Sequence, residues 1–353
     1  MSRCQAVWNN IHIQPNGNTL PCCAWPSSVP FDRDAVKTQM SLEQSVEGCA
    51  ICTAQEATNQ YSLRQYYNKQ QPADDIVSVD LSADNVCNLQ CIMCSSEYSH
   101  QNAHREQLFL GQRYNPDTVS SNTLYTDINW SNVRYLKLFG GEPTYSPGIA
   151  KFLDWAEDRI DFTRIRIEVV TNNIQLPTTQ LDAVLRRCAG VRVLVSKDGT
   201  QGVNQMIRQG TPNNYNEDDH FDYWESVGNE LWINTAVSIY NALDQVNLQQ
   251  WIHDHRSRWG QHFEMVQTPH QLNLQNMPKD LKAAYAAQPM PLEILQWMQA
   301  DGTDLFDQFL SINGAFHQLY TMNLERNNPV LYNYTQASKQ TPSGFDTIKE
   351  QYI

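Results

Sequence analysis

Short runs in which hydrophobic and polar residues alternate recur through the middle of the chain. From residue 76 onward six such runs are rich in Val, Ile and Leu and end in polar or glycine-containing turns, as β-strands do. The six predicted strands are 76–82, 133–139, 164–170, 191–196, 231–239 and 262–267. Amphipathic stretches separate them, so the pattern predicts six strand–helix units in an α/β fold, with a parallel sheet curved into a partial barrel.

The stretches between the strands include three clear helix candidates. These are residues 147–160, 178–190 and 243–259. In the second, Leu181, Val184 and Leu185 recur at helical spacing, and Gly190 is suited to the C-cap. Cys188 lies on the same predicted helix face, so we expect it to be a buried small apolar residue and not a metal ligand.

Neither end of the chain shows this alternation of predicted strands and helices. The first 75 residues are irregular and rich in cysteine, whereas the chain beyond about residue 275 looks helical, most clearly over 291–310. No internal repeat of fixed period is visible. We therefore predict three parts: a small cysteine-rich domain at 1–72, the α/β barrel at 73–275 and a mostly helical extension at 276–353.

Composition and charge narrow the range of functions. The 353 residues, 41% of them hydrophobic, can form one large domain with an appendage or two domains. The net charge of −13 argues against extensive electrostatic binding of nucleic acid or anionic lipid. A local basic channel is the alternative that this charge leaves possible. We see no signal-peptide core and no apolar run of roughly 18–20 residues, and expect a soluble cytoplasmic protein without membrane contact. Its nine cysteines are then metal ligands in preference to disulfides.

Three of the cysteines, Cys87, Cys91 and Cys94, fall within the eight residues "CNLQCIMC" directly after the first predicted strand. Structural zinc sites usually take four ligands in pairs, and no fourth Cys or His is adjacent, although His100 and His104 lie nearby. A loop that binds three irons of a four-iron cluster and leaves the fourth iron open for a substrate or cofactor explains the count of three better.

The same segment resembles the signature of the radical S-adenosylmethionine (SAM) enzymes, which lies at the end of the first strand of their partial (β/α)6 barrel. In that family three cysteines hold a [4Fe–4S] cluster, and the amino and carboxylate groups of SAM bind the fourth iron. The reduced cluster cleaves SAM to a 5′-deoxyadenosyl radical, which abstracts a hydrogen atom from the substrate. Met93 stands where many members have an aromatic residue, as in the subgroup with an extra cluster domain, and the resemblance implies that it lies at the cofactor.

The segment "FGGEP" (139–143), after the second predicted strand, closely resembles the GGEP motif of these enzymes. Consecutive glycines let a backbone approach a ligand closely, and a Glu accepts hydrogen bonds from an ammonium group. The resemblance implies that Gly140, Gly141 and Glu142 contact SAM at its amino group. The alternative is a plain glycine turn with a Glu on the surface.

Polar segments follow the later predicted strands and resemble further walls of the SAM pocket. They are "VVTNN" (169–173), "VSKDGT" (195–200) and "NQMIRQGT" (204–211). The resemblance implies SAM contacts from Thr171, Asn172, Ser196, Asp198 and Arg208, the last with the SAM carboxylate. Asn173 replaces the usual Gly but tolerates a left-handed turn conformation. Asn234 and Asn241 are as consistent with strand-end structure as with substrate or cofactor contact.

The N-terminal cysteines form a second group. In residues 4–23 two alternating arms flank "PNGN", which predicts a β-hairpin with Cys4 and Cys22 on opposite arms. Cys49 and Cys52 add a C-x2-C pair. Four thiolates can bind zinc or a [4Fe–4S] cluster, and the spacing alone does not choose between them.

This region resembles the SPASM and twitch domains of radical SAM enzymes, which hold auxiliary clusters. Residues 48–68, with Glu56, Ser62 and Arg64, resemble the next segment of twitch-containing members. The resemblance implies an auxiliary [4Fe–4S] cluster held by Cys4, Cys22, Cys49 and Cys52. Cys23 is an alternative to Cys22, but only Cys22 fits the spacing from the hairpin glycine. The domain precedes the barrel here, as in a group from bacterial and phage genomes that "MNLERNNPVL" (322–331) also resembles.

The leading hypothesis is therefore a radical SAM enzyme with two [4Fe–4S] clusters, served by a flavodoxin- or ferredoxin-type reductant. The auxiliary cluster accepts an electron, conducts electrons or binds substrate. We favour a peptide or protein substrate, because an acidic chain can attract a basic peptide; a small molecule is the alternative. A nucleotide or tRNA substrate is disfavoured by the charge. A non-catalytic zinc or iron–sulfur protein is the competing class.

Overall fold

The fold was analysed in a computed structural model that describes residues 3–26, 28–57, 61–69, 73–103, 105–106, 124–212, 214–320 and 322–338. Its centre is an eight-stranded sheet in the order β10-β9-β7-β6-β5-β3-β1-β2. Six neighbouring strands are parallel: β3 (Ser78–Ser82), β5 (Tyr135–Phe139), β6 (Arg166–Thr171), β7 (Gly190–Ser196), β9 (Glu230–Val237) and β10 (Gly260–Met265). All six predicted strands are confirmed, with ends within two residues of the expected ones.

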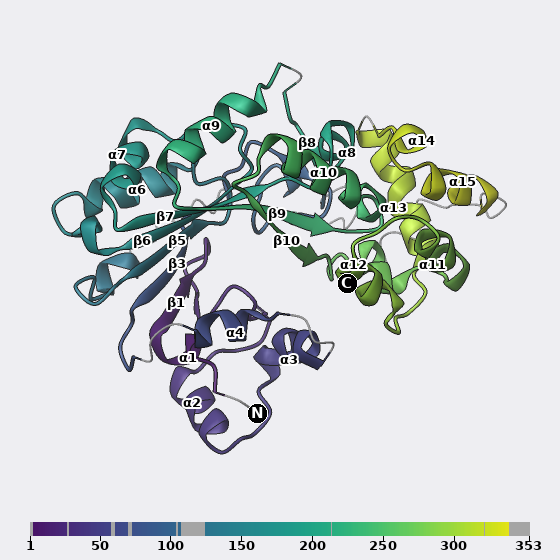
Figure 1. Cartoon of the computed structure of the whole chain (residues 1–353). Coiled ribbons are helices and arrows are strands. Elements are labelled where there is room, and N and C mark those ends of the chain that lie inside the picture. Colours follow the sequence, from purple (N-terminus) through teal and green to yellow (C-terminus); the bar gives the residue numbers. More distant parts are fainter. Residues whose placement is uncertain are drawn as a thin grey trace.

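The six parallel strands lie side by side in chain order, so every crossover runs in the same direction along the sheet. Such winding places the connecting helices on one face. Figure 1 shows α6 (Pro147–Ala156), α7 (Thr179–Arg187) and α9 (Glu217–Val227) on this face, and α10 (Gln245–His255) packs into the same core. The parallel α/β sheet is thus as predicted.

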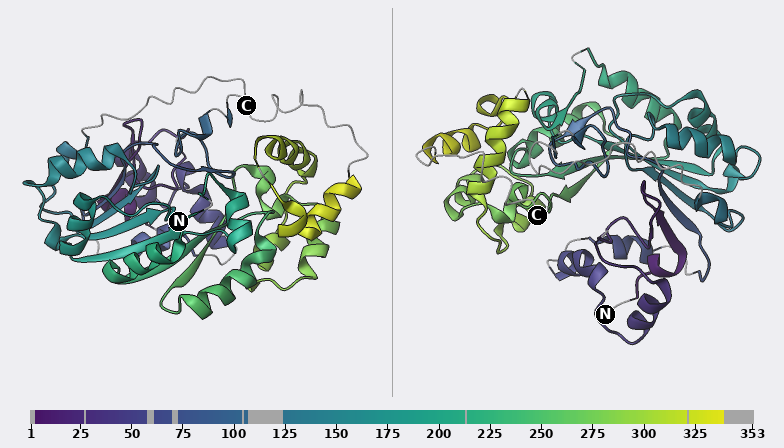
Figure 2. Two further views of the ribbon diagram at one scale, coloured as in Figure 1. Left: turned by 90° about the horizontal axis from the view of Figure 1, so that it is seen from above. Right: turned by 180° about the vertical axis from the view of Figure 1, so that it is seen from behind.

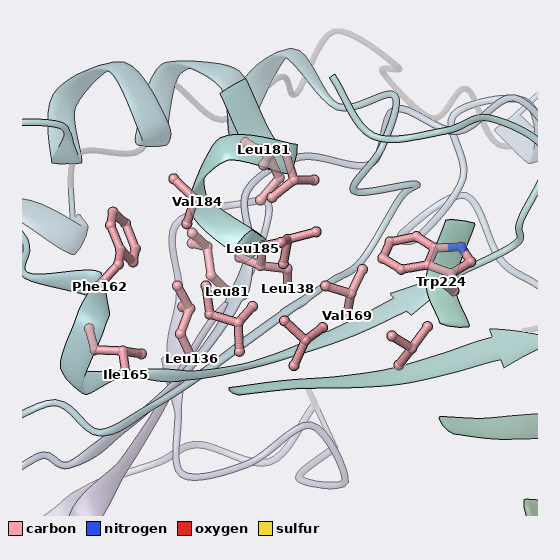
Figure 3. Packing of buried hydrophobic residues seen from close by; sticks show 14 of the residues in the cluster. Leu81, Leu136, Leu138, Phe162, Ile165, Val169, Leu181, Val184, Leu185 and Trp224 are labelled. Carbon is pink, nitrogen blue, oxygen red and sulfur yellow. The ribbon is translucent and has the colours of Figure 1, made fainter. Parts of the chain in front are cut away.

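The core between the sheet and these helices follows from strand alternation. Every second strand residue, such as Leu136, Leu138 and Val169, points to the helices and meets Leu181 of α7 and Trp224 of α9 (Figure 3). Burying such a side chain contributes about 1.5–3 kcal/mol. The other strand residues therefore point to the opposite face, which is called the inner face below.

The second predicted helix ends earlier than expected. α7 stops at Arg187, Cys188 is its C-cap, and Gly190 begins β7, so the prediction that Gly190 caps the helix is wrong. Only Cys188 and Ala189 connect α7 to β7, so no separate glycine turn lies between them, and Gly190 is the first residue of the strand. Cys188 packs against the core as expected but is only half-buried, so the prediction that it is buried is met in part.

The N-terminal region contains the predicted hairpin. Its elements are α1 (Ala6–Asn9), β1 (Asn10–Ile13), β2 (Thr19–Leu20), α2 (Arg33–Ser41), α3 (Ala50–Ala57) and α4 (Leu63–Asn68). His12 lies opposite Leu20 in the antiparallel pair, and Gly17 in the turn has a φ of +90°. The pairing of β1 with β3 was not foreseen: it is parallel and joins the hairpin to the central sheet. The remaining N-terminal elements gather below the sheet (Figure 1).

The C-terminal region is helical, as predicted. It comprises α11 (Lys279–Ala286), α12 (Leu292–Gln299), α13 (Phe306–Leu319), α14 (Leu324–Asn327) and α15 (Pro329–Ser338). The predicted stretch 291–310 is interrupted between α12 and α13 by "ADGTDL", whose four central residues, "DGTD", are poor helix formers. These helices share one apolar core with α8 (Gln201–Ile207) and the segment after β9 (Figure 2).

A second, two-stranded sheet consists of β4 (Gln90–Cys91) and β8 (Arg208–Gln209). Short 3-10 helices lie at Glu47–Cys49, Leu124–Asp127, Phe162–Arg164, Ala242–Asp244, His270–Leu272 and Leu274–Asn276. Of the helices in the described ranges, none combines the length and apolar character that a membrane crossing requires.

Candidate active site at the carboxyl ends of the strands

The central cysteines lie on the loop that leaves the carboxyl end of β3. Cys87 and Cys91 are buried and Cys94 is half-buried, while Leu89 and Ile92, each 1% exposed, anchor the loop in the interior. Burial, followed by the nearness of Cys91, raises the pKa of Cys87 and brings that of Cys94 to about 12. The three thiols are therefore close enough to affect one another's pKa. The loop that carries them is fixed by the buried Leu89 and Ile92.

Several N–H groups point at these sulfurs. The backbone N–H of Leu89 donates to Cys87 Sγ at 3.5 Å, and Asn172 Nδ2 donates to the same sulfur at 3.7 Å. Arg208 Nη1 donates to Cys91 Sγ at 3.7 Å. Donors of this kind favour a thiolate over a thiol, which is the form that a metal cluster binds.

The glycine turn after β5 packs against the cysteine loop. The N–H of Gly141 donates to Asp84 O at 3.2 Å, and that of Glu142 donates to Val86 O at 2.9 Å. Gly140 has a φ of +113°, and a Cβ on Gly141 would lie 2.2 Å from Val86 O. Position 140 thus requires glycine because of its positive φ, and position 141 requires it because the turn closely approaches the backbone of the cysteine loop.

Glu142 is buried, only 1% exposed, so the alternative of a surface Glu is wrong. Its Oε1 accepts from Thr171 Oγ1 at 2.7 Å and from Thr144 Oγ1 at 2.8 Å, and its Oε2 accepts from the N–H of Asn172 at 2.6 Å. Burial raises the pKa of Glu142, and these hydrogen bonds oppose the rise. The ends of β5 and β6 are thereby tied together beside Cys87.

The turn after β6 has the conformation that its sequence permits. Asn173 has a φ of +65°, the left-handed region that Asn tolerates. Its Oδ1 accepts from Trp224 Nε1 at 2.9 Å. Asn172 Nδ2 also donates to Asn88 Oδ1 at 2.7 Å, which connects this turn to the cysteine loop.

Asp198 and Arg208 form a buried ion pair next to Cys91. Arg208 Nε lies 3.0 Å from Asp198 Oδ2, and Arg208 Nη2 donates to Asp198 Oδ1 at 3.2 Å. Burial raises the pKa of Asp198, and the Arg208 guanidinium opposes this rise. The resemblance implied separate SAM contacts for these two residues, whereas here they are paired with each other.

The remaining predicted SAM contacts lie around the same edge of the sheet. Ser196, half-buried, ends β7 opposite Asn234 of β9, and Met93 packs, half-buried, against the cysteine loop. Asn234 Oδ1 lies 2.9 Å from His262 Nδ1. Asn241 is fully buried and donates to Asp198 O at 2.7 Å, which favours its strand-end role.

The N-terminal cysteines form a separate group inside the N-terminal region. Cys4, Cys49 and Cys52 are buried, and burial raises the pKa of Cys4 to about 12 and that of Cys49 to about 11. Cys22 is half-buried and packs against the apolar cluster that contains Cys4 and Cys49, and it interacts electrostatically with Cys23, Cys4 and Cys52. Cys23 instead interacts with Lys137, Asp80 and other charges on the inner face of the sheet.

Glu56, Ser62 and Arg64 support this cysteine group. Ser62 Oγ donates to Glu56 Oε1 at 2.5 Å, and Arg64 Nε donates to the same oxygen at 2.9 Å. Ser62 also caps α4, in a capping box with Gln65. Backbone N–H groups of Leu63 and Arg64 interact with the Cys52 sulfur, so α4 is held against the cysteines.

The described residues can be compared with the ligand arrangement that a single metal ion requires. Across the described residues, no three His, Cys, Asp or Glu side chains converge as mononuclear ligands do. His100, named above as a possible zinc ligand, uses Nδ1 to accept from the N–H of Cys87 at 3.2 Å, and His104 lies outside the described residues. A four-iron cluster binds each thiolate to a different iron, so its ligands are spaced more widely.

Sequence reasoning missed residues that hold the cysteine loop. Arg105 donates from Nη1 to Cys91 O at 3.1 Å and from Nη2 to Cys94 O. Asp84 Oδ2 accepts from Ser146 Oγ at 2.8 Å and from the N–H of Gly148, and so ties the loop to α6. Asp84 lies two residues after the first predicted strand, a signal that was available, whereas nothing in the sequence marks Arg105.

Comparison with known proteins gives structural likeness only. No protein-family model matches the chain, and no curated protein matches it. It is similar to hexahistidine-tagged anSMEcpe with bound AdoMet, at 17% identity and a TM-score of 0.37, covering 57% of this chain and 56% of the other.

Two further similar structures were solved with a peptide. Streptococcus suis SuiB bound to precursor peptide SuiA is 12% identical, with 76% and 48% of the two chains covered and a TM-score of 0.37. Native anSMEcpe with bound AdoMet and Cp18Cys peptide is 15% identical, with 68% and 58% covered and a TM-score of 0.36. The chain thus spans about half the length of these proteins, and the likeness does not establish a family.

Proposed function

We propose that the protein is a radical SAM enzyme. The observation that carries the proposal is a loop with three thiols, Cys87, Cys91 and Cys94, at the carboxyl end of the first of six parallel strands. Functional groups in parallel α/β folds collect at this edge. The loop offers no fourth thiol, which leaves one position of a four-iron cluster for a small-molecule ligand.

The residues at the next strand ends suit the two charged groups of SAM. Glu142 has a carboxylate oxygen, Oε2, with a single hydrogen-bond donor, so it can also accept from an ammonium group. Arg208 has five N–H donors and can bind a carboxylate while it remains paired with Asp198. Gly140, Gly141, Thr171, Asn172, Ser196 and Met93 form the rest of the proposed pocket. A [4Fe–4S] cluster held by Cys87, Cys91 and Cys94 would, when reduced, supply the electron that breaks SAM into methionine and a 5′-deoxyadenosyl radical.

We also propose an auxiliary [4Fe–4S] cluster held by Cys4, Cys22, Cys49 and Cys52. Support comes from the burial of Cys4, Cys49 and Cys52 and from the packing of Cys22 against the apolar cluster that contains Cys4 and Cys49, while Cys23 interacts with charged residues of the inner face. Four protein ligands close such a cluster, which suits electron transfer better than ligand cleavage. The reductant would be a flavodoxin- or ferredoxin-type protein, and the substrate a peptide or protein.

Anaerobic reconstitution of the full chain tests the proposal. We expect about eight irons per chain, as two four-iron clusters require, and formation of 5′-deoxyadenosine from SAM after reduction with dithionite. Stoichiometric zinc without SAM cleavage would overturn the enzyme and support a metal-binding protein. Salt-dependent binding of RNA by an active enzyme would instead support the hypothesis that the substrate is a nucleotide or tRNA.

A further inference from the structure

One row of charged residues crosses the inner face of the sheet. Successive strand registers place its members directly opposite one another, in the order His12, Asp80, Lys137, Glu168, Arg192, Glu230. Burial, followed by Lys137, lowers the pKa of His12 to about 3, so the histidine is neutral. The other five residues, from Asp80 to Glu230, alternate between acidic and basic across five strands. We call these five residues the charged row.

The charged row faces a cavity of about 250 Å³ between α4 and the sheet. Its lining residues include Tyr66, Tyr67, Lys69, Ser78, Asp80, Tyr135, Lys137, Arg166, Glu168, Arg192 and Glu230. The cavity lies toward the amino ends of the strands, away from the cysteine loop. Gly141 is the fourth residue after Lys137 and lies just beyond the end of β5 at Phe139, a span of about 13 Å in an extended chain.

Ion pairs hold the row together. Glu168 lies 3.1 Å from Lys137 Nζ and 3.2 Å from Arg192 Nη1, so it bridges two cations. Buried ion pairs are weak contributors to stability, because desolvation offsets their attraction, and apolar residues in their place are often more stabilising. A network of this size beside an open cavity is therefore better explained by ligand recognition than by folding.

Two cations of the charged row, Arg192 and Lys137, have N–H groups that the ion pairs of the row do not use. Arg192 Nε is buried and makes no hydrogen bond; the nearest carboxylate oxygen, on Glu230, is 3.8 Å away. The Arg192 guanidinium lies between the rings of Tyr66 and Trp232, with centroid distances of 5.5 and 5.8 Å, which fixes its plane. Lys137 meets one carboxylate at 3.1 Å and has two further N–H donors.

The cavity carries an excess of positive charge within an acidic protein. Its lining has four cations, Lys69, Lys137, Arg166 and Arg192, against three acids, Asp80, Glu168 and Glu230, a difference of one. Burial also raises the pKa of Asp80, which adds to the excess. A group with one negative charge would balance it.

An apolar row separates the charged row from the cysteine loop. Phe139, Val170, Leu194 and Trp232 occupy the next inward-facing positions and are half-buried. A ligand that reaches from the strand ends to the charged row therefore needs an apolar middle and a charged end.

We propose that this cavity binds a carboxylate of the peptide substrate, with Arg192 and Lys137 as its donors. The inference rests on the proposed function for the identity of the ligand as substrate. An extended peptide covers about 13 Å with roughly four residues, so the carboxylate lies about four residues from the residue that reacts at the strand ends.

Fragment binding tests the site on the full-length, anaerobically reconstituted protein. The probes are N-acetyl-glutamate methylamide, its glutamine counterpart and N-acetylalanine, titrated by saturation-transfer NMR. We expect the glutamate fragment to bind at least about tenfold more tightly than the glutamine fragment, since charge-assisted hydrogen bonds are roughly twice as strong as neutral ones. N-acetylalanine distinguishes a C-terminal carboxylate from a side-chain carboxylate.

The variant Arg192→Met should weaken glutamate binding at least about tenfold, and Lys137→Met should weaken it less, because a bidentate donor is lost in the first and a point charge in the second. Arg258→Met is the matched control, since Arg258 is an exposed arginine outside the cavity that meets Glu225. Thermal unfolding identifies a variant that fails to fold, in which case Lys137→Met decides.

Equal binding of the glutamate and glutamine fragments, or unchanged binding by a folded Arg192→Met or Lys137→Met variant, would overturn the carboxylate site. SAM cleavage without substrate is measured on the same preparations. Cleavage without carboxylate binding leaves the proposed enzyme intact and rejects only this site. Carboxylate binding without cleavage rejects the enzyme and the role of the ligand as its substrate.

Discussion

The two cysteine groups differ in how the fold surrounds them. The central group has three thiols at an edge of the sheet, with side-chain donors from Asn172 and Arg208 that belong to other strand ends. The N-terminal group has four thiols enclosed by its own local elements, with backbone donors next to Cys52. A site assembled from many strand ends can accept and orient a ligand, whereas an enclosed site with a full set of thiols suits electron transfer.

Loss of a central cysteine should have the largest effect. In Cys87→Ala we expect about four of about eight irons to be lost and SAM cleavage to be abolished, because the loop has only Cys91 and Cys94 besides Cys87 and no fourth thiol that could replace it. Iron analysis and 5′-deoxyadenosine assay measure both. Cys188→Ala is the control and should behave as the wild type; cleavage that survives in Cys87→Ala contradicts the central site.

Removal of the cation beside Cys91 should have the next largest effect. Arg208→Met leaves Asp198 buried without its partner, which costs about 3–5 kcal/mol of unfolding free energy. Loss of its contact with the Cys91 sulfur should lower SAM cleavage roughly 10- to 100-fold. Denaturant unfolding and the cleavage rate are measured beside Arg258→Met, and an unchanged rate would show that the pair is only structural.

Loss of an N-terminal ligand should affect iron content more than cleavage. Cys49→Ala should lose about four irons and still cleave SAM, because the central loop is separate, but the cleavage should no longer be coupled to product. Product formation is followed by mass spectrometry once a substrate is in hand, and cleavage can be measured at once. Full substrate turnover in this variant would rule out the auxiliary role.

Substitutions of the adjacent Cys22 and Cys23 should have the smallest effect, but they directly distinguish the two candidate ligands of the auxiliary cluster. Cys22→Ser should lose the N-terminal iron, whereas Cys23→Ser should keep it, since Cys23 interacts with Lys137 and Asp80 on the inner face. Iron content and the visible absorption of the clusters report the difference. If Cys23→Ser alone loses iron, the two residues have exchanged roles.

Much of the fold follows from local sequence. The six strands were predictable because β-branched and leucine residues alternate within each of them, and the hairpin because "PNGN" favours a tight turn. The end of α7 was misjudged, because a glycine after a helix can equally begin a strand, as Gly190 does. The cysteine loop and the GGE turn were recognisable as motifs, but not the backbone contact between Gly141 and Val86 that requires the glycine.

The sequence by itself determined which residues of each strand share a face, since that needs only the two-residue period of a β-strand. Only the tertiary structure decided which strands are neighbours and in what register. The parallel pairing of β1 with β3, the Asp198–Arg208 pair and the charged row from Asp80 to Glu230 all depend on it. Register is set by the packing of whole strands and helices against one another, and no local pattern encodes it.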